Sequence, residues 1–396
     1  MIRKKVLLRA PLLTNSGYGV HSRQIFNWLY EREDVELVVE CLQWGRTSWL
    51  LDGDLENGTI GKIMNCSQPF EKEDIDISFQ VQLPDEWDES LGKLNVGVTA
   101  LVETDKCSSV WVEKCNKMDQ IVVPSTFTKN VLKRSGPLKK PVTVIPEWFN
   151  PELMNKSKLV KTLDDDRFKC ISEPFTVLMI GTLTSQAQQD DRKNLVNTIK
   201  WVSEEFKNKK DVAILIKTNF GKGTTEDKKL CSEYLKKIKP ALGLTEFPKI
   251  KLLHGNMKTE EVAALFNHEK VKLYVSATRG EGYGLPLVEA AASGLPIVAT
   301  GWSGHLQFLD KEKFGCVDYN LKEISETRVD NRIFEKGFRW AEPLETSFKR
   351  EVRKVYEDYN TSKVKAQEMM KNIQSNFSDT AIKKQYDELF KQCVKK

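Results

Sequence analysis

Short apolar segments typical of strands alternate with segments of helical spacing along most of this chain, and this alternation restricts the fold more than any other feature. The first example is Val6–Ala10, an apolar run followed by a glycine-containing loop and by Val20–Tyr30 at helical spacing. Strands that alternate with helices favour a parallel sheet covered by helices on both faces. In this first part the expected strands are 6–10, 35–41, 75–81, 96–102, 121–123 and 142–145, and further helices are expected at 109–117 and 126–134.

The alternation starts again after a polar stretch that lacks sustained periodicity and contains three consecutive aspartates, Asp164–Asp166. We interpret residues 151–173 as a linker between an α/β domain at 1–150 and a second one at 174–343. Residues 344–396 are charged and helical in pattern. In the second domain the expected strands are 175–180, 212–216, 250–253, 271–275 and 296–299, and the expected helices are 195–206, 226–238, 259–266 and 285–293.

The composition is that of a protein with a hydrophobic core. Hydrophobic residues make up 40% of the 396 residues and charged residues 30%, which excludes a disordered chain. The formal net charge is +5, and residues 346–396 contain twelve basic and seven acidic residues. The excess positive charge of this segment therefore equals that of the whole chain.

Cysteine usage and hydropathy indicate a cytoplasmic protein. The eight cysteines are scattered and form no C-x-x-C pair, which argues against a zinc site and against a disulfide framework. Arg9 interrupts the apolar run near the N-terminus, so no signal peptide is expected. No stretch approaches the roughly 20 apolar residues that a membrane span needs, and we expect no transmembrane segment.

The segment with most chemical information is 276–290, which reads SATRGEGYGLPLVEA and connects an expected strand to a helix that opens at Leu285. Its glycines let the backbone approach a ligand, and the first turn of the helix offers free N–H groups to an anion. Glu289, one turn into the helix, has the chemistry to accept hydrogen bonds from a ribose diol, and Glu281 lies in the loop where an attached sugar would meet it. The alternative is a glycine-rich turn with an acid favoured by the helix dipole.

The match extends beyond the glycines, because Glu281 and Glu289 enclose seven residues and the similarity continues to Thr300. This stretch resembles the signature of retaining glycosyltransferases related to glycogen and sucrose synthases, glycosyltransferase family four. The resemblance implies the GT-B fold, two Rossmann-like domains that face a cleft, with C-terminal helices that pack back on the first domain. It also implies that Glu281 contacts the donor sugar and Glu289 the ribose. The amides of Gly282, Tyr283, Gly284 and Leu285 would face the diphosphate and the sugar.

A second element supports this interpretation. The strand 175–180 is followed by Gly181-Thr182, and Arg192 and Lys193 stand where a helix begins. A paired arginine and lysine would stabilise the negative charge that develops on a nucleotide-diphosphate leaving group, and the family uses such a pair. In the family the arginine usually follows the strand glycine directly, and here Thr182 occupies that place. A solvated basic helix start is the alternative, which the helix dipole disfavours.

The loop between the first strand and helix contains Gly17 and Gly19. It corresponds to the loop by which the family's N-terminal domain touches the donor phosphates and the acceptor, although a lone G-x-G is also common in turns. His21 has the chemistry to donate to a phosphate, but we favour a partly exposed capping residue.

Many relatives carry a histidine near the sugar after a middle strand of the first domain, and this chain has Glu103 there. The resemblance to a subgroup with an acid at that point makes Glu103 a candidate to accept or orient the acceptor's proton. An exposed acid at a strand end is an equal alternative. Structural roles are expected for His254 and His305, and a surface position for His268.

The leading hypothesis is a retaining glycosyltransferase that moves a sugar from a nucleotide-diphosphate sugar to an acceptor hydroxyl, with no cofactor and no metal ligand. The first alternative is a DNA-modifying glycosyltransferase that acts on a hydroxylated base. It rests on the basic tail and on Lys129, Lys133, Arg134, Lys139 and Lys140. The remaining alternatives are a sugar-nucleotide epimerase and a binding-only relative. The donor base, the sugar and the acceptor are not specified by these residues.

Overall fold

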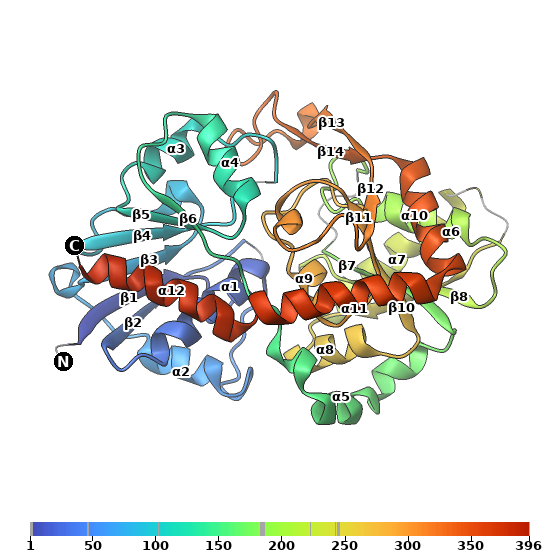
Figure 1. Cartoon of the computed structure of the whole chain (residues 1–396), viewed down its shortest axis with the longest axis horizontal. Coiled ribbons are helices and arrows are strands. Elements are labelled where there is room, and N and C mark those ends of the chain that lie inside the picture. Colours follow the sequence, from blue (N-terminus) through green and yellow to red (C-terminus); the bar gives the residue numbers. More distant parts are fainter. Residues whose placement is uncertain are drawn as a thin grey trace. The chain divides into compact units, whose positions relative to one another are not determined.

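The computed structural model describes residues 3–45, 47–101, 103–182, 187–221, 223–241, 243 and 246–395, with the backbone alone at 239 and 241. The chain forms two compact units, shown in Figure 1. Unit 1 comprises Met1–Trp148, Asp330–Glu335 and Phe377–Lys396, and unit 2 comprises Phe149–Val329 and Lys336–Asn376.

Unit 1 is built on a six-stranded sheet of order β2-β1-β3-β4-β5-β6, in which all neighbouring strands are parallel. Helices cover both of its faces, and Figure 1 shows α1 and α12 on one side and α3 and α4 on the other. The strands are β1 (Lys4–Ala10), β2 (Val35–Cys41), β3 (Ile77–Val81), β4 (Leu94–Val98), β5 (Gln120–Val123) and β6 (Val142–Val144). The helices are α1 (Gly17–Tyr30), α2 (Thr59–Cys66), α3 (Ser109–Cys115), α4 (Thr126–Ser135) and α12 (Asp379–Val394).

The last helix of the chain, α12, belongs to the core of unit 1. Tyr386 and Phe390 are almost fully buried and lie with Trp28 of α1 in one cluster with the strand residues. The ring centroids of Trp28 and Tyr386 are 4.9 Å apart, and those of Trp28 and Phe390 are 5.9 Å apart. The Trp28 Nε1–H group donates to Asp387 Oδ1 at 2.9 Å. Aromatic packing and a buried donor with its acceptor therefore fix α12 against α1.

Unit 2 has a second six-stranded sheet of order β12-β11-β10-β7-β8-β9, again parallel throughout. A separate antiparallel hairpin pairs β13 with β14. The strands are β7 (Phe175–Ile180), β8 (Val212–Thr218), β9 (Lys249–His254), β10 (Val271–Ser276), β11 (Ile297–Thr300), β12 (Gly315–Val317), β13 (Tyr319–Glu323) and β14 (Arg339–Pro343). The helices are α5 (Lys156–Leu163), α6 (Leu195–Glu205), α7 (Thr225–Ala241), α8 (Thr259–Asn267), α9 (Leu285–Ala292), α10 (Glu345–Glu357) and α11 (Tyr359–Asn376).

The first strand of each unit lies inside its sheet, at the point where the strand order reverses. In unit 1 the chain leaves β1 toward β2 on one side and returns to β3 on the other, and in unit 2 β7 lies between β8 and β10. Parallel α/β sheets bind ligands beyond the carboxyl ends of the strands at such a reversal. This topology places the loop after β1, and the loops after β7 and β10, where ligands bind in related folds.

Several elements differ from the expectation from sequence. The strand expected at 96–102 ends at Val98, so Glu103 lies within a loop, and Val102 is outside the described residues. The stretch 151–173, expected as a linker, forms α5 and two short 3-10 helices, with Leu159 and Phe168 buried. Its helical face is short and interrupted, which hides the periodicity. No described helix is long and apolar enough to cross a membrane.

The packing of α12 predicts how unit 1 responds to substitution. Phe390→Ala removes a side chain that is 1% exposed and should lower the free energy of unfolding of unit 1 by about 3 kcal/mol. Val394→Ala, on the same helix but 42% exposed, is the matched control and should change it by less than about 0.5 kcal/mol. Urea unfolding followed by tryptophan fluorescence measures both. Equal stability of the two variants would contradict a core role for α12.

Candidate active site

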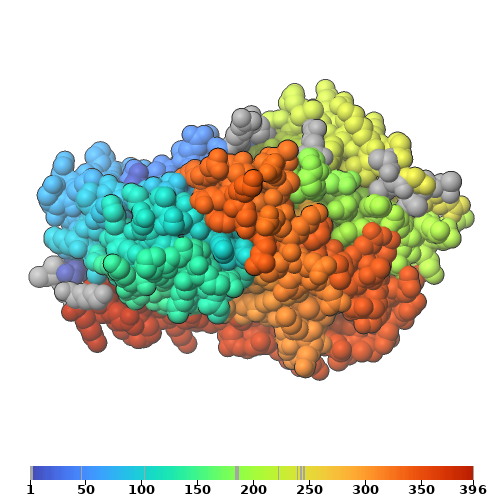
Figure 2. Space-filling view, turned by 90° about the horizontal axis from the view of Figure 1, so that it is seen from above, coloured from blue at the N-terminus to red at the C-terminus, as the bar shows by residue number. Residues whose placement is uncertain are grey.

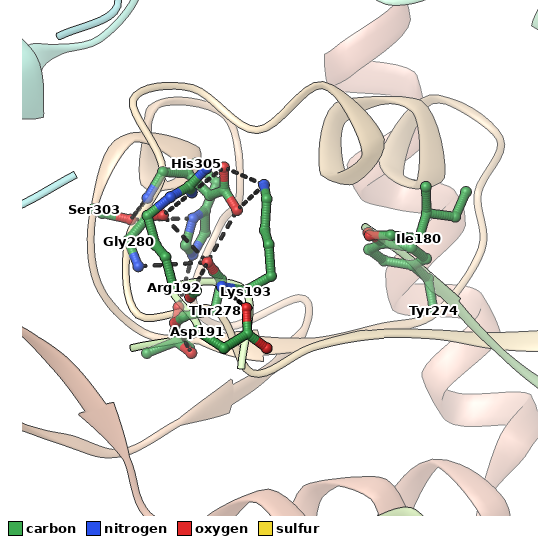
Figure 3. Close-up of polar contacts among 11 residues, drawn as sticks. Ile180, Asp191, Arg192, Lys193, Tyr274, Thr278, Gly280, Ser303 and His305 are labelled. Carbon is green, nitrogen blue, oxygen red and sulfur yellow. Dashed lines mark hydrogen bonds and ion pairs between the residues drawn. The ribbon is translucent and has the colours of Figure 1, made fainter. Parts of the chain in front are cut away.

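A carboxylate with two cations forms the centre of the polar cluster beyond β7 and β10. Lys193 Nζ lies 2.6 Å and 2.8 Å from the two carboxylate oxygens of Glu281, and Arg192 Nη1 lies 3.2 Å from Oε2. Arg192 and Lys193 reach this cluster from one loop, as the close-up in Figure 3 shows. Thr278 Oγ1 donates a further hydrogen bond to Glu281 Oε1 at 2.9 Å. The structure therefore brings together three of the residues that were expected to act on a donor.

Glu281 stays ionised although it is buried. Its exposure is only 7%, and burial by itself favours the neutral acid. The charges of Lys193 and Arg192, with the hydrogen bonds from Lys193 and Thr278, overcome this effect and hold the pKa of Glu281 at about 2. One carboxylate and two cations leave this cluster with one net positive charge, which is suited to an anionic ligand.

Asp191 fixes the loop that carries Arg192 and Lys193 by accepting hydrogen bonds from its backbone. The Asp191 carboxylate accepts from the backbone N–H of Lys193 at 3.2 Å and from that of Leu195 at 2.7 Å. These bonds satisfy N–H groups at the start of α6. Asn194, the residue before the helix, has a φ of +53°, in the left-handed region that asparagine tolerates better than most residues. This turn directs both cations toward Glu281.

Arg279 positions the loops of the site, and it was not among the residues expected from sequence. It is 3% exposed and pairs with both oxygens of Glu342, each at 2.9 Å. Its Nη1 donates to the carbonyls of Gln188 and Asp191, at 2.9 Å and 2.6 Å. One buried guanidinium thus joins the glycine-rich loop to the Arg192 loop and to β14. The available signal in the sequence was the position of this arginine inside the motif segment. A buried arginine needs several polar partners, and Arg279 finds them on neighbouring segments.

The start of α9 has the geometry of an anion site. Gly284 precedes the helix with a φ of +102°, where a side chain would be strained. The backbone N–H groups of Gly284 and Leu285 donate to no described residue. Tyr283 is 2% exposed and packs on Phe308, so its ring anchors the loop. The backbone of Gly282 packs closely against Gly304, since a Cβ on Gly304 would come within 1.9 Å of the carbonyl oxygen of Gly282.

His305 and Ser303 support the backbone of Glu281. The Glu281 N–H donates to Ser303 Oγ at 2.9 Å, and His305 Nε2 lies 2.7 Å from the carbonyl of Thr300. Since a carbonyl only accepts, Nε2 of His305 carries the proton. Burial lowers the pKa of His305, which is therefore a neutral structural residue, as expected from sequence.

Glu289 lies half-buried on α9 and shares its surroundings with Lys217 at the end of β8. Burial raises the pKa of Glu289 to about 8, and the positive charge of Lys217 opposes this shift only in part. Burial in turn lowers the pKa of Lys217. Thr182, after β7, is exposed. Donor binding by Glu289 and by Thr182 remains a prediction.

In unit 1, the first turn of α1 is tied to the loop after β4. The Tyr18 hydroxyl lies 3.1 Å from Thr99 Oγ1 and accepts from the N–H of Ala100 at 3.0 Å. Burial raises the pKa of Tyr18 well above its usual range, and the Glu103 carboxylate adds to the shift. Glu103 therefore lies within electrostatic reach of Tyr18, on a loop in which Leu101 has a φ of +53°.

Gly17 and Gly19 were expected in a loop but lie in the first turn of α1, and the two glycines differ. Gly17 is exposed, with open space where a Cβ would stand. Gly19 is buried, its N–H donates to Ser16 Oγ at 2.9 Å, and a Cβ would come within 2.1 Å of the Thr14 carbonyl oxygen. Gly19 is thus required for close packing and for the helix cap, while Gly17 is open to a ligand. Their roles in donor binding stay predictions.

His21 differs from the expected capping residue. It is 2% exposed, and its Nε2 lies 3.2 Å from the Tyr386 hydroxyl on α12. Burial lowers the pKa of His21 to about 4. The contact is made by a helix 365 residues further along the chain, which local sequence does not reveal. His254 pairs with Asp227 at 2.8 Å, and His268 is half-buried at the end of α8.

Among the described residues, Asp227, Cys231 and His254 place potential metal ligands within 4.8 Å of one another. Both oxygens of Asp227 already accept from the N–H of Phe220, at 3.0 Å and 3.2 Å. Burial and the neighbouring Asp227 raise the pKa of Cys231 to about 12, which keeps the thiol protonated. The Asp-x-Asp spacing, which can bind a metal ion in other proteins, occurs at Asp52 and Asp54, and both aspartates are exposed on unit 1. We assign no metal to these groups.

Known proteins resemble this chain in part of its sequence and in its whole fold. Residues 247–384 match the family model described as Family 4 Glycosyltransferase in conflict systems. No curated protein sequence matches the chain. Among solved structures, a glycosyltransferase from Rickettsia africae is 13% identical over 99% of both chains, with a TM-score of 0.68.

Two further structures share the whole fold. Sucrose-phosphate synthase from Thermosynechococcus elongatus is 14% identical over 99% of both chains, with a TM-score of 0.65. Anabaena HepE, in complex with UDP and glucose, is 14% identical over 98% of this chain and 100% of its own, with a TM-score of 0.60. At this identity the likeness establishes the architecture, which is GT-B, as expected from sequence.

The raised pKa of Glu289 predicts a pH-dependent stability. Between about pH 4.5 and 8 the folded protein holds a proton on Glu289 that the unfolded chain has released, so this residue lowers stability as the pH rises. Glu289→Gln removes that loss. The melting temperature of the variant relative to the unchanged protein should therefore increase by at least about 2 °C from pH 5.5 to pH 8.5. A constant difference between the two pH values would contradict the shift.

Proposed function

We propose that this chain is a retaining glycosyltransferase of the family-four type that transfers a sugar from a nucleotide-diphosphate sugar to an acceptor hydroxyl. The family match and the GT-B fold support this proposal. One observation carries the proposal. Arg192 and Lys193 converge on the buried Glu281, which lies next to Gly284 at the start of α9. This arrangement offers both positive charge and hydrogen-bond donors to a diphosphate.

The reaction requires stabilisation of the leaving group. As the bond between the sugar C1 and the phosphate oxygen breaks, negative charge grows on the nucleotide diphosphate. Lys193 and Arg192 are assigned to stabilise that charge, and Glu281 to accept hydrogen bonds from sugar hydroxyls. Because Glu281 holds both cations before the donor arrives, little reorganisation is needed in the transition state.

The acceptor oxygen forms the new bond to C1 on the face that the phosphate leaves, and its proton passes to the departing phosphate oxygen. This same-face course retains the configuration at C1 and follows the family resemblance in the motif. It needs neither a protein nucleophile nor a metal ion. Uridine nucleotides are the first donors to test, because the similar HepE structures contain UDP and UDP-glucose.

On the acceptor side we assign Glu103 and the first turn of α1, at Gly17, to orienting the incoming hydroxyl. The support is that Glu103 lies close enough to raise the pKa of Tyr18, whose hydroxyl is bonded to the loop after β4. A carboxylate here has the chemistry to orient a hydroxyl group by accepting a hydrogen bond from it.

Substitution of the cations tests the donor site. Lys193→Ala and Glu281→Ala should each lower the rate of UDP release from UDP-glucose by about 100-fold or more. The first removes a cation that stabilises the leaving group, and the second removes the carboxylate that holds both cations and binds the sugar hydroxyls. Lys200→Ala is the matched control, because Lys200 lies on α6 and pairs only weakly with Glu204, at 3.8 Å. Unchanged release by the Lys193 or the Glu281 variant would contradict the assignment of that residue.

The stereochemistry and the metal requirement are tested on the reaction itself. Proton NMR of the product should show the anomeric configuration of the donor, because the same-face mechanism retains it. Treatment with EDTA should leave the rate unchanged within about 20%, since no step is assigned to a metal. An inverted product, or a loss of activity that added Mg²⁺ or Mn²⁺ restores, would overturn this part of the proposal.

A further inference from the structure

The strongest positive patch among the described residues of unit 1 follows α4 and its flanking loops. Residues 106–140 contain eight basic and only two acidic residues, an excess of six in 35 residues. Seven of these cations, all except Lys117, form no ion pair or side-chain hydrogen bond with a described residue, and six of the seven lie outside α3. We call these six the α4 basic surface: Lys106, Lys129, Lys133, Arg134, Lys139 and Lys140.

The basic tail is different, because six of its eleven described cations are neutralised locally by ion pairs. Arg353 pairs with Glu205 on α6, and Lys349 pairs with Glu204 and Glu345. On α12, Lys383 pairs with Glu31 and Lys391 with Glu388. Among the described tail residues, the cations without an ion pair, such as Lys365, Lys371 and Lys384, are spread along α11 and α12, whereas the α4 basic surface gathers six such cations on one helix and its flanking loops.

The α4 basic surface lies beside the loop of Glu103. Thr128 Oγ1 donates to the Ala100 carbonyl at 3.4 Å, and Ser135 Oγ accepts from the Cys107 N–H at 2.8 Å. These contacts hold the loop along α4 from one end of the helix to the other, and Lys106 of that loop is itself exposed. A partner bound to α4 would therefore reach the loop that carries the proposed acceptor residue.

The chemistry of the surface favours a nucleic acid over a membrane. Helices that lie on membranes insert large apolar side chains together with their cations. The aliphatic residues of α4, Val131 and Leu132, are fully buried in unit 1, and α4 has no exposed large hydrophobic side chain. Cations without apolar anchors are suited to the phosphates of a duplex, which they bind with release of counterions. Figure 2 shows the outer surface of this part of the chain, in teal to green.

We infer that the α4 basic surface binds the phosphate backbone of duplex DNA, and that DNA carries the acceptor hydroxyl of the proposed transfer. The second half rests on the proposed function, and the first half does not. In the transfer, the donor C1–O bond to phosphate breaks, a new C1–O bond forms to a hydroxyl on the duplex, and the hydroxyl proton goes to the leaving phosphate.

Fluorescence anisotropy with a labelled 20-base-pair duplex tests the surface in the full-length protein. If all six cations contact phosphates, the affinity should fall by about 1000-fold between 50 mM and 200 mM salt. Lys133→Glu/Arg134→Glu should weaken binding at 50 mM salt by at least about 10-fold and reduce the salt slope by about two. Lys139→Gln/Lys140→Gln, in the loop after α4, provides a second variant that leaves the helix intact.

The matched control is Lys365→Glu/Lys371→Glu, which changes the net charge by the same amount at exposed positions of α11. It should change duplex affinity less than about twofold. The inference is overturned if the duplex does not bind at 50 mM salt, if the control loses as much affinity as the α4 variants, or if vesicles containing phosphatidylglycerol bind and the duplex does not.

A labelled-sugar assay separates this inference from the proposed function. Duplex containing 5-hydroxymethylcytosine should accept label from UDP-glucose, and the α4 variants should lower incorporation without lowering UDP release in the absence of DNA. Release without incorporation would overturn DNA as the acceptor and leave the glycosyltransferase proposal standing. No release with any nucleotide sugar, together with intact duplex binding, would overturn the proposed function and with it DNA as the acceptor, and would leave the duplex-binding surface standing.

Discussion

The ion cluster of Glu281 with Lys193 and Arg192 is the interaction on which the rest of the site depends. A buried carboxylate without partners would be protonated, and two cations so close together would repel each other. Together the three groups are stable in a site with little water, and they retain one positive charge. The structure thus keeps an anion-binding charge in place without leaving it uncompensated.

The parallel sheet of unit 2 explains why these residues meet. Arg192 and Lys193 follow β7 and Glu281 follows β10, and these two strands are neighbours at the reversal of strand order. Arg279 then fixes the separation of the two loops through the carbonyls of Gln188 and Asp191. Unit 1 depends on the far end of the chain in a similar way, since its core includes Phe390 and Tyr386. Its folding is therefore completed only after the C-terminal segment is available.

Local patterns predicted much of this structure. The strand at Val35–Cys41 has the expected bounds, and the glycine-rich segment forms the expected connection between β10 and α9. The failures arise where long-range contacts decide. His21 is buried by Tyr386, and Arg279 acts through partners on two separate segments, the Arg192 loop and β14. The edge strand β12 and the hairpin of β13 and β14 were missed because they are short and carry little periodicity.

Positive charge proved to be a local property: six unpaired cations lie on α4 and its flanking loops, and ion pairs neutralise about half of the described cations of the C-terminal segment. The central claim, however, concerns the donor, and hydrogen exchange tests it most directly. Addition of UDP should slow amide exchange at residues 280–289 and 191–195, because the diphosphate would bind the start of α9 and the loop of Lys193. Binding of UDP with protection confined to other segments would contradict the account.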